Sequence, residues 1–237
     1  MLKTRSKEEI QKDYDEGSEV YDEQRFYHPG GKYMDETEKS IVFKSLKSGS
    51  VLELGTGTSR YGVFLAKQGF EFTGIDISKG MLTVAKEKAK KEKVNLDLLQ
   101  MDAENLGFSP CTFDNVICIH ALRFIDPLKS LNEARRVLKP GGRIIAQFDA
   151  LDAYFTKLSL RLKEIKGIDV KMRFYTHNEV ETLFKKTGFN IVTIKNLFNF
   201  PMTFYHIAPE FFIKIVKKID NKMKKGNIIV VIGEKEK

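Results

Sequence analysis

The sequence predicts an α/β fold: a doubly wound, mainly parallel sheet of seven strands with helical cover elements. Apolar runs alternate along the chain with segments whose apolar residues recur at helical spacing, which is the rhythm of βαβ units. The first run, 51–54, breaks into closely spaced glycines and resumes as the apolar helical stripe 63–67. A strand, a tight turn and a helix start in that order are typical of this class. The 237 residues, 42% hydrophobic and 30% charged, suffice for a large core.

Seven segments have the composition of strands, and helices are expected between them. Asp126 before Pro127 is typical of an N-cap followed by the first helical residue. Thr176 with Glu179 forms a capping box, so His177 is expected to be an exposed first-turn residue. Ser78 is the expected N-cap of the helix after the second strand. The strands are expected at 51–54, 69–76, 96–101, 113–119, 143–149, 189–194 and 227–233.

Residues 7–28 are polar and aromatic, and they are expected to form a helix that covers part of the domain. Tyr14 and Tyr21 are seven residues apart, which is two helical turns and places both rings on one face. The proline and glycines of 28–31 are expected to break the chain, and apolar spacing predicts the next helix at 36–46. A basic helix is also expected at 214–225, before the last strand.

The glycine turn is the strongest indication of a ligand site. Gly55 and Gly57 permit positive φ and close approach of the backbone to a ligand. A dinucleotide fingerprint has a third glycine where this chain has Arg60. The acid Glu53, two residues before the turn, suits a positively charged ligand such as an ammonium or a sulfonium. Asp76 lies about 20 residues beyond the turn, where a carboxylate accepts hydrogen bonds from ribose hydroxyls.

Over residues 53–59 the sequence resembles the class I S-adenosylmethionine (SAM)-dependent methyltransferases, whose first motif reads acid-x-G-x-G-x-G. This chain has Ser59 at the last glycine position. The segment 136–142, Arg-Val-Leu-Lys-Pro-Gly-Gly, matches the same family and has a structural role at the end of a helix. The resemblance covers roughly residues 40–150 and is strongest to the group that includes ubiquinone-biosynthesis-type enzymes. It implies the Rossmann-like methyltransferase fold and SAM as the cofactor.

The resemblance also implies a role for each acid. Glu53 and the glycine backbone would hold the methionine moiety, Asp76 the ribose, and Asp102 the adenine amino group. Apolar residues that follow Asp76 would contact the adenine ring, and a leading helix with Tyr21 and Arg25 would close over the cofactor. The predicted cofactor-binding residues are Tyr21, Arg25, Glu53, Gly55, Thr56, Gly57, Asp76, Ile77, Met81, Asp102, Ala103 and Ile119.

The loop after the fourth strand is where an acceptor would meet the methyl group. Methyltransferases that act on exocyclic amino groups of bases or on glutamine carry an Asn/Asp-Pro-Pro-aromatic tetrapeptide there. This chain has Ile119-His120-Ala121-Leu122 instead, which disfavours those substrates. His120 is the predicted catalytic residue, because a histidine near neutral pKa could take a proton from the acceptor. A histidine that is merely packed beside the strand end is the alternative.

These observations predict a single methyltransferase domain over 1–237. It comprises an N-terminal helical cover (1–35), a cofactor-binding core (36–149) and two aromatic-rich substrate-side insertions (150–175 and 197–225). The predicted activity moves a methyl group from SAM to a small-molecule acceptor by in-line displacement. Positioning and exclusion of water can supply most of the rate enhancement in such a reaction.

Other functions stay open at this point. The formal charge of +8 permits an RNA-modifying methyltransferase, but the lysines are interleaved with acids along helices and do not identify a partner. A nicotinamide (NAD)-dependent oxidoreductase and a non-catalytic nucleoside-cofactor binder are the alternatives outside the class. Cys111 and Cys118 lack metal-ligand spacing, so no metal is predicted. No apolar run is long enough to span a membrane and no signal sequence is evident, so a cytoplasmic location is expected. The oligomeric state is left open.

Overall fold

The computed structural model describes residues 5–200, 202–220 and 226–236, and its centre is a seven-stranded sheet. The strand order is β3-β2-β1-β4-β5-β7-β6. The first five strands pair in parallel, whereas β7 lies antiparallel between β5 and β6. The predicted doubly wound, mainly parallel sheet is therefore confirmed. The strands are β1 Ser50–Leu54, β2 Glu71–Asp76, β3 Asp97–Gln100, β4 Phe113–Cys118, β5 Leu138–Asp149, β6 Phe189–Leu197 and β7 Ile228–Lys235.

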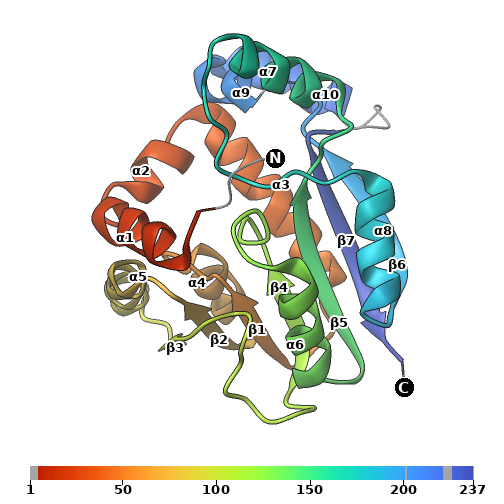
Figure 1. Ribbon diagram of the computed structural model, residues 1–237. Helices are drawn as coiled ribbons and strands as arrows, with labels where there is room; N and C mark the ends of the chain where they lie inside the picture. Colours follow the sequence, from red (N-terminus) through yellow and green to blue (C-terminus); the bar gives the residue numbers. More distant parts are fainter. Residues whose placement is uncertain (1–4, 201, 221–225, 237) are drawn as a thin grey trace.

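Helices cover both faces of this sheet and its ligand edge. In Figure 1, α1 and α2 lie to the left of the sheet, and α7, α9 and α10 gather at the top. The helices of the described residues are α1 Lys7–Gly17, α2 Tyr21–Phe26, α3 Pro29–Ser45, α4 Arg60–Lys67, α5 Lys79–Glu92, α6 Pro127–Val137, α7 Tyr154–Ile165, α8 His177–Lys186, α9 Met202–Ile207 and α10 Glu210–Asp220.

Two hydrophobic cores lie on the two faces of the sheet, because successive side chains of a strand point to opposite sides. Ile144 of β5 belongs to the core beneath α6 and α8. Its neighbour Ile145 belongs to the core beneath α3, α4, α5, α9 and α10. Both side chains are fully buried. The central strands β1, β4, β5 and β7 are therefore apolar on both faces along much of their length, whereas the edge strands β3 and β6 are partly exposed.

The predicted caps are present. The Asp126 carboxylate accepts hydrogen bonds from two backbone amides of α6, with Pro127 as the first helical residue. Ser78 caps α5, and Thr176 forms the expected capping box with Glu179 at the start of α8.

The expectation that His177 is exposed is wrong. Its ring lies half-buried between Asp152 and Asn196, with N···O distances of 2.8 and 2.6 Å.

Two predictions about the N-terminal segment are also wrong. Tyr14 and Tyr21 do not share one helix, since α1 ends at Gly17 and α2 begins at Tyr21; their rings nevertheless pack with centroids 6.0 Å apart. The expected break at 28–31 is instead the start of α3, where His28 Nδ1 accepts a hydrogen bond from the Gly31 amide. The N-terminal cover is therefore three helices joined by tight turns.

Two boundaries differ further along the chain. The strand expected to begin at 143 extends back to Leu138, through the Pro-Gly-Gly segment that was expected to be a turn. The expected basic helix at 214–225 begins earlier, at Glu210, and residues 221–225 lie outside the described part of the chain. Within the described residues, no helix is both long and apolar enough to cross a membrane.

Candidate cofactor and substrate site

The main cavity opens where the order of the strands reverses. β1 lies between β2 and β4, so the chain leaves β1 to one side and returns on the other. In open α/β sheets this switch point, at the carboxyl ends of the strands, leaves a crevice for a ligand. The cavity is lined by residues that follow β1, β2, β3 and β4, and α1 contributes Lys7, Ile10 and Tyr14 to its outer wall.

The turn after β1 has the backbone that its glycines predict. Gly55 has φ +71° and Gly57 has φ +53°. A Cβ on Gly55 would lie 2.7 Å from the Cβ of Ala121, whereas one on Gly57 would meet nothing within 4 Å. Gly57 therefore lines the cavity with open space beside it, which leaves room for a ligand to approach the backbone.

Ser59 stands where the related motif has its last glycine, and it adopts a glycine-like conformation. Its φ of +55° is in the left-handed region, and its side chain is fully buried. Gly62, one turn further along α4, makes room for it: a Cβ there would lie 2.1 Å from Ser59 Oγ. The departure from the motif is thus accommodated by a second glycine, and the turn keeps its shape.

Glu53 is a buried carboxylate at the end of β1 that faces this cavity. Its Oε2 accepts a hydrogen bond from Thr56 Oγ1 at 2.6 Å. Burial raises the pKa of Glu53 to about 8, because the charged form is poorly solvated. Across the described ranges no lysine, arginine or histidine forms an ion pair with it. Without a ligand this carboxyl group is therefore mostly protonated near neutral pH, and a cationic ligand would favour its charged form.

Asp76, at the end of β2, is oriented by two backbone amides. Its Oδ2 accepts from the Gly57 amide at 2.8 Å, and its Oδ1 accepts from the Ser78 amide at 2.9 Å. Burial raises its pKa, and these two hydrogen bonds oppose the shift. Ile77 and Met81 line the same part of the cavity. A carboxylate next to apolar side chains suits a sugar hydroxyl beside a flat ring.

Asp102 follows β3 and pairs with the first turn of α1. Lys7 Nζ lies 2.6 Å from Asp102 Oδ2 and 2.8 Å from Glu104 Oε2. The other oxygen of Asp102 accepts from the Glu104 amide at 2.9 Å. Lys7 and Asp102 both line the cavity and keep more than a third of their side chains exposed. This pair joins the N-terminal helix to the edge of the sheet.

His120 follows β4 and both of its ring nitrogens have partners. Nδ1 lies 3.0 Å from Gln147 Nε2 and 3.2 Å from an Arg123 nitrogen, and both of these groups are donors. Nδ1 is therefore the acceptor, and Nε2 donates to Glu38 Oε2 at 3.1 Å. Burial lowers the pKa of His120 to about 3, and the positive charges of Arg25 and Arg123 act in the same direction. The imidazole is neutral at pH 7.

Glu38 of α3 connects this histidine to α4. Its Oε2 also accepts from an Arg60 nitrogen at 2.7 Å and from the Tyr61 hydroxyl at 3.3 Å. Burial alone would raise the pKa of Glu38, but His120 and Arg60 outweigh it and hold this pKa well below the usual range. Arg60, which replaces the third glycine of a dinucleotide fingerprint, thus has a structural role between α3 and α4.

Eleven of the twelve predicted cofactor residues line the main cavity together with His120; Arg25 is the exception. Arg25 lines a second cavity that adjoins the first through Tyr21. The paired tyrosines and the family resemblance predicted a covering N-terminal helix, but no sequence pattern indicated that Lys7, Ile10 or α4 would line the cavity. The additional lining residues are Lys7, Ile10, Tyr14, Thr58, Arg60, Tyr61, Met101, Ala121, Phe124 and Ile125.

Comparisons with known proteins agree with this geometry. The model of the family described as methyltransferase domain matches residues 52–146, which hold the glycine turn and the first five strands. An uncharacterized protein of Methanocaldococcus jannaschii is 33% identical over 211 residues, with 79% of each chain covered. This chain belongs to the class I SAM-dependent methyltransferases. It is a methyltransferase, and its family uses SAM.

Two further relatives of this methyltransferase carry descriptive names. The ubiquinone biosynthesis O-methyltransferase of Coxiella burnetii is 32% identical over 101 residues, covering 42% of this chain and 43% of that protein. A solved structure from Thermotoga maritima, described as a SAM-dependent methyltransferase and possible histamine N-methyltransferase, superposes with a TM-score of 0.73. It is 23% identical and covers 96% of this chain and 100% of that one, so it shows the shared fold.

The residues of the main cavity fit SAM chemically. Glu53 offers a buried carboxylate for a cationic group, and Asp76 offers oriented acceptor oxygens for hydroxyl donors. The space beside Gly57 leaves the backbone accessible to a ligand. An NAD-dependent oxidoreductase would instead use this turn for a pyrophosphate, which the uncompensated acid Glu53 disfavours.

Proposed function

We propose that this methyltransferase transfers the methyl group of SAM to a small-molecule acceptor by in-line displacement. When bound, SAM supplies a methyl group on a positively charged sulfur, which becomes neutral as the methyl group leaves. The observation that carries the proposal is the buried Glu53 carboxylate, which forms no ion pair within the part of the chain that the structure describes. A ligand that brings an ammonium and a sulfonium would stabilise the charged form of this carboxyl group.

Each acid then has a role toward one part of the cofactor. Glu53 would bind the ammonium of the methionine moiety, alongside the backbone of Gly55, Thr56 and Gly57. Asp76 would accept hydrogen bonds from the ribose hydroxyls. The adenine would lie against a set of side chains with Asp102 at its edge, namely Ile77, Met81, Ala103 and Ile119.

The N-terminal helices exclude water from this cavity. Tyr14 packs edge-on against Phe124, with ring centroids 5.8 Å apart, and both side chains line the cavity. Asp22 of α2 accepts a hydrogen bond from Thr58 Oγ1 at 2.7 Å, directly after the glycine turn. Excluding water strengthens the electrostatic contacts inside the site.

His120 remains our candidate for the group that handles the acceptor's proton. As a neutral imidazole it could accept a proton only after Arg123 or Gln147 releases Nδ1, or Glu38 takes the proton from Nε2. A base is not required for every acceptor, because positioning supplies most of the effect. The same contacts hold the His120 ring in place, so that it can form part of the wall against which the acceptor lies.

A small acceptor is favoured over RNA by the second cavity. This cavity lies beneath α7, within the first of the two predicted substrate-side insertions, and its walls include Phe155 and Phe174. A cavity with apolar walls suits a small molecule. RNA stays the alternative, and transfer of a labelled methyl group to total RNA in preference to a metabolite extract would establish it.

Calorimetric titration tests the cofactor. We expect SAM and its demethylated product to bind and NAD not to bind. Glu53→Gln should weaken SAM binding at least about tenfold, since a charge-assisted hydrogen bond is lost. Glu87→Gln, at an exposed position of α5, is the matched control and should bind SAM like the parent protein. Binding of NAD in place of SAM would contradict the proposal.

A further inference from the structure

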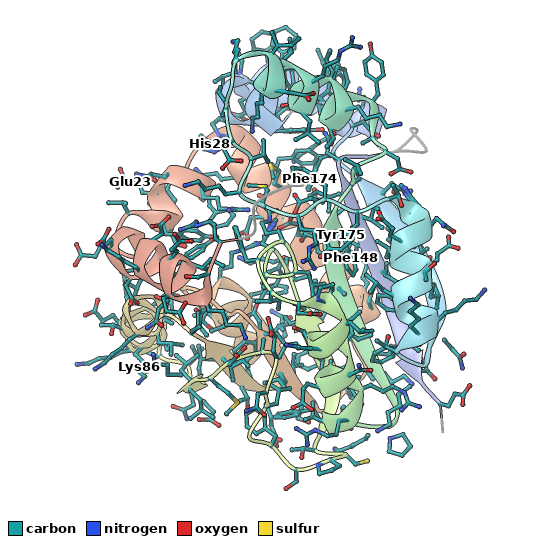
Figure 2. All side chains as sticks on the ribbon, in the orientation of Figure 1. Glu23, His28, Lys86, Phe148, Phe174 and Tyr175 are labelled. Atoms are coloured by element: carbon teal, nitrogen blue, oxygen red, sulfur yellow. The ribbon has the colours of Figure 1, made fainter. Side chains whose placement is uncertain are left out.

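The second cavity has apolar walls and adjoins the cofactor site. It is bounded by α2, α3, α7 and the segment between α7 and α8, which passes across α3 in the view of Figure 1. In Figure 2, Phe174 on this segment lies below α7 and above Tyr175 and Phe148. The apolar lining side chains are Phe26, Met34, Phe155, Leu160, Met172 and Phe174. A hydrocarbon or aromatic body would be well accommodated there.

The charged residues of this cavity are mostly basic. Arg25, Arg123 and Lys163 line it, with Asp149 as the acidic lining residue among those described. Arg123 and Asp149 form an ion pair with an N···O distance of 2.9 Å, and both side chains are nearly buried. This pair is internally compensated, so the remaining charge of the cavity is positive.

Of the three basic residues, Arg25 and Lys163 form no ion pair within the described residues, and Arg25 is the one whose charged group lies over aromatic rings. Throughout the described residues no carboxylate forms an ion pair with its guanidinium. The guanidinium is half-buried and lies over the rings of Tyr21 and Phe26, at 5.6 and 5.8 Å from their centroids. These rings orient the planar group. A guanidinium held in this way is suited to a carboxylate, which it can bind through two parallel hydrogen bonds.

The second cavity adjoins the main cavity. Tyr21 lines both cavities. Arg123, in the second cavity, contacts His120, which lines the first. A molecule anchored at Arg25 would therefore extend toward the cofactor along a wall made by Tyr21, Arg123 and His120.

We propose that the second cavity is the acceptor subsite and that the methyl acceptor is a small molecule with a carboxylate on an apolar or aromatic body. Arg25 binds the carboxylate, while the apolar side chains beneath α7 hold the body. The inference rests on the proposed function, since an acceptor subsite presupposes SAM in the adjoining cavity. It assigns Arg25 to the acceptor rather than to the cofactor.

Matched probes test the charge preference. The protein, saturated with S-adenosylhomocysteine, is titrated with 3-phenylpropanoate, with its neutral amide 3-phenylpropanamide and with the cationic 3-phenylpropylamine. We expect the carboxylate to bind at least tenfold more tightly than the amide, and the amine to bind most weakly. Equal binding of the three probes, or tighter binding of the amine, would overturn the inference.

Substitutions at Arg25 test whether this residue binds the carboxylate of the probe. Arg25→Gln should reduce 3-phenylpropanoate binding about tenfold or more and leave the amide unchanged, whereas Arg25→Lys should keep part of the preference. Arg161→Gln, at an exposed position of α7, is the control and should change neither. S-adenosylhomocysteine affinity is measured for each variant. An Arg25→Gln protein that loses the cofactor, or that still prefers the carboxylate, contradicts the assignment.

Different results would contradict the proposed function and the acceptor inference. If the parent protein binds neither SAM nor S-adenosylhomocysteine, the proposed function fails. If the cofactor binds but the carboxylate probe shows no advantage over its amide, the proposed function stands and the acceptor inference fails. Thermal melting of each variant confirms that a loss of binding does not come from unfolding.

Discussion

Asp15 of α1 caps the start of α5 through Gly80, 65 residues away. The Asp15 carboxylate accepts a hydrogen bond from the Gly80 amide at 2.8 Å and another from Ser78 Oγ at 2.6 Å. The close approach depends on a missing side chain, because a Cβ on Gly80 would lie 2.8 Å from the Asp15 carbonyl oxygen. This contact holds α1 against the start of α5, in addition to the Lys7 contact with Asp102.

Gly80→Ala should displace α1 and weaken SAM binding about fivefold, which corresponds to the loss of about 1 kcal/mol of hydrogen bonding. Alanine is the better helix former by about 1 kcal/mol, so α5 itself should not lose stability. Gly17→Ala is the matched control, because a Cβ there meets nothing within 4 Å. The measurements are SAM titration and the rate of tryptic cleavage within residues 7–20. Unchanged affinity and cleavage in Gly80→Ala would show that α1 does not cover the bound cofactor.

The buried Glu53 should make the ligand-free protein less stable at high pH. Its pKa rises from 4.5 to about 8 on folding, so the folded state holds a proton that the unfolded state has released. The free energy of unfolding therefore falls as the pH rises from about 4.5 to about 8. Glu53→Gln should remove this dependence and melt at a higher temperature than the parent at pH 8, with a smaller difference at pH 5. Melting curves of both proteins that run parallel across this pH range would refute the assignment.

Gly57→Ala should reduce SAM binding while Gly69→Ala leaves it unchanged. Both glycines have positive φ, +53° and +85°, and neither would place a Cβ within 4 Å of another atom. Alanine in the left-handed region costs about 1–2 kcal/mol, so both variants should lose similar stability. Only Gly57 lines the cavity, so only there would the new methyl group meet the ligand. Calorimetry with SAM distinguishes the two, and equal affinities would indicate that the ligand does not approach this turn.

His120 should stay neutral between pH 5 and 8. Burial lowers its pKa to about 3, so the folded protein resists a proton that the unfolded chain accepts near pH 6.5. The contribution of this group to stability is thus constant above pH 6.5 and declines as the pH falls below it. Nitrogen-15 NMR of the imidazole should show a protonated Nε2 and an unprotonated Nδ1 throughout. Titration with a midpoint near 6.5 would show that the ring is accessible to water.

Local patterns predict the sheet well but not its order. The central strands β1, β4 and β5 are buried on both faces and are recognisable as apolar runs, and the order of β1 to β5 along the chain follows the βα rhythm. The insertion of β7 between β5 and β6 leaves no local signal, since residues 228–232 are apolar whichever strands flank them. Strand pairing between distant parts of the chain depends on the whole sequence, so a single segment does not predict it.

The predicted break at residues 28–31 is wrong for a specific reason. Gly30 and Gly31 are typical of a break, but here they lie in the helix because other backbone is close to both. A Cβ on Gly30 would lie 1.7 Å from the Tyr205 carbonyl oxygen, and one on Gly31 would lie 2.3 Å from that of Arg25. The N-cap is the ring of His28, which replaces the usual short polar side chain.

The residues of the candidate site fall into two groups: those that a local pattern identifies and those that only the fold brings together. Glu53 and Asp76 could be identified because each lies at a fixed distance from the glycine turn, within one βαβ unit. The Lys7 contact with Asp102 joins residues 95 positions apart and has no local signal. The prediction that Arg25 binds the cofactor comes from the family resemblance, in which a leading helix with a tyrosine and an arginine closes over the cofactor. Tyr21 and Arg25 share α2, but only Tyr21 lines the main cavity, whereas Arg25 lines the second cavity.

The position of β7 has a consequence for biosynthesis. Residues 228–235 pair with β5 on one side and β6 on the other, although both of those strands precede them in the chain. A nascent polypeptide on the ribosome would therefore present two open sheet edges until this last strand emerges. We expect the growing chain to depend on chaperones at that stage. The sheet should then be completed in one late step, after β7 has been synthesised.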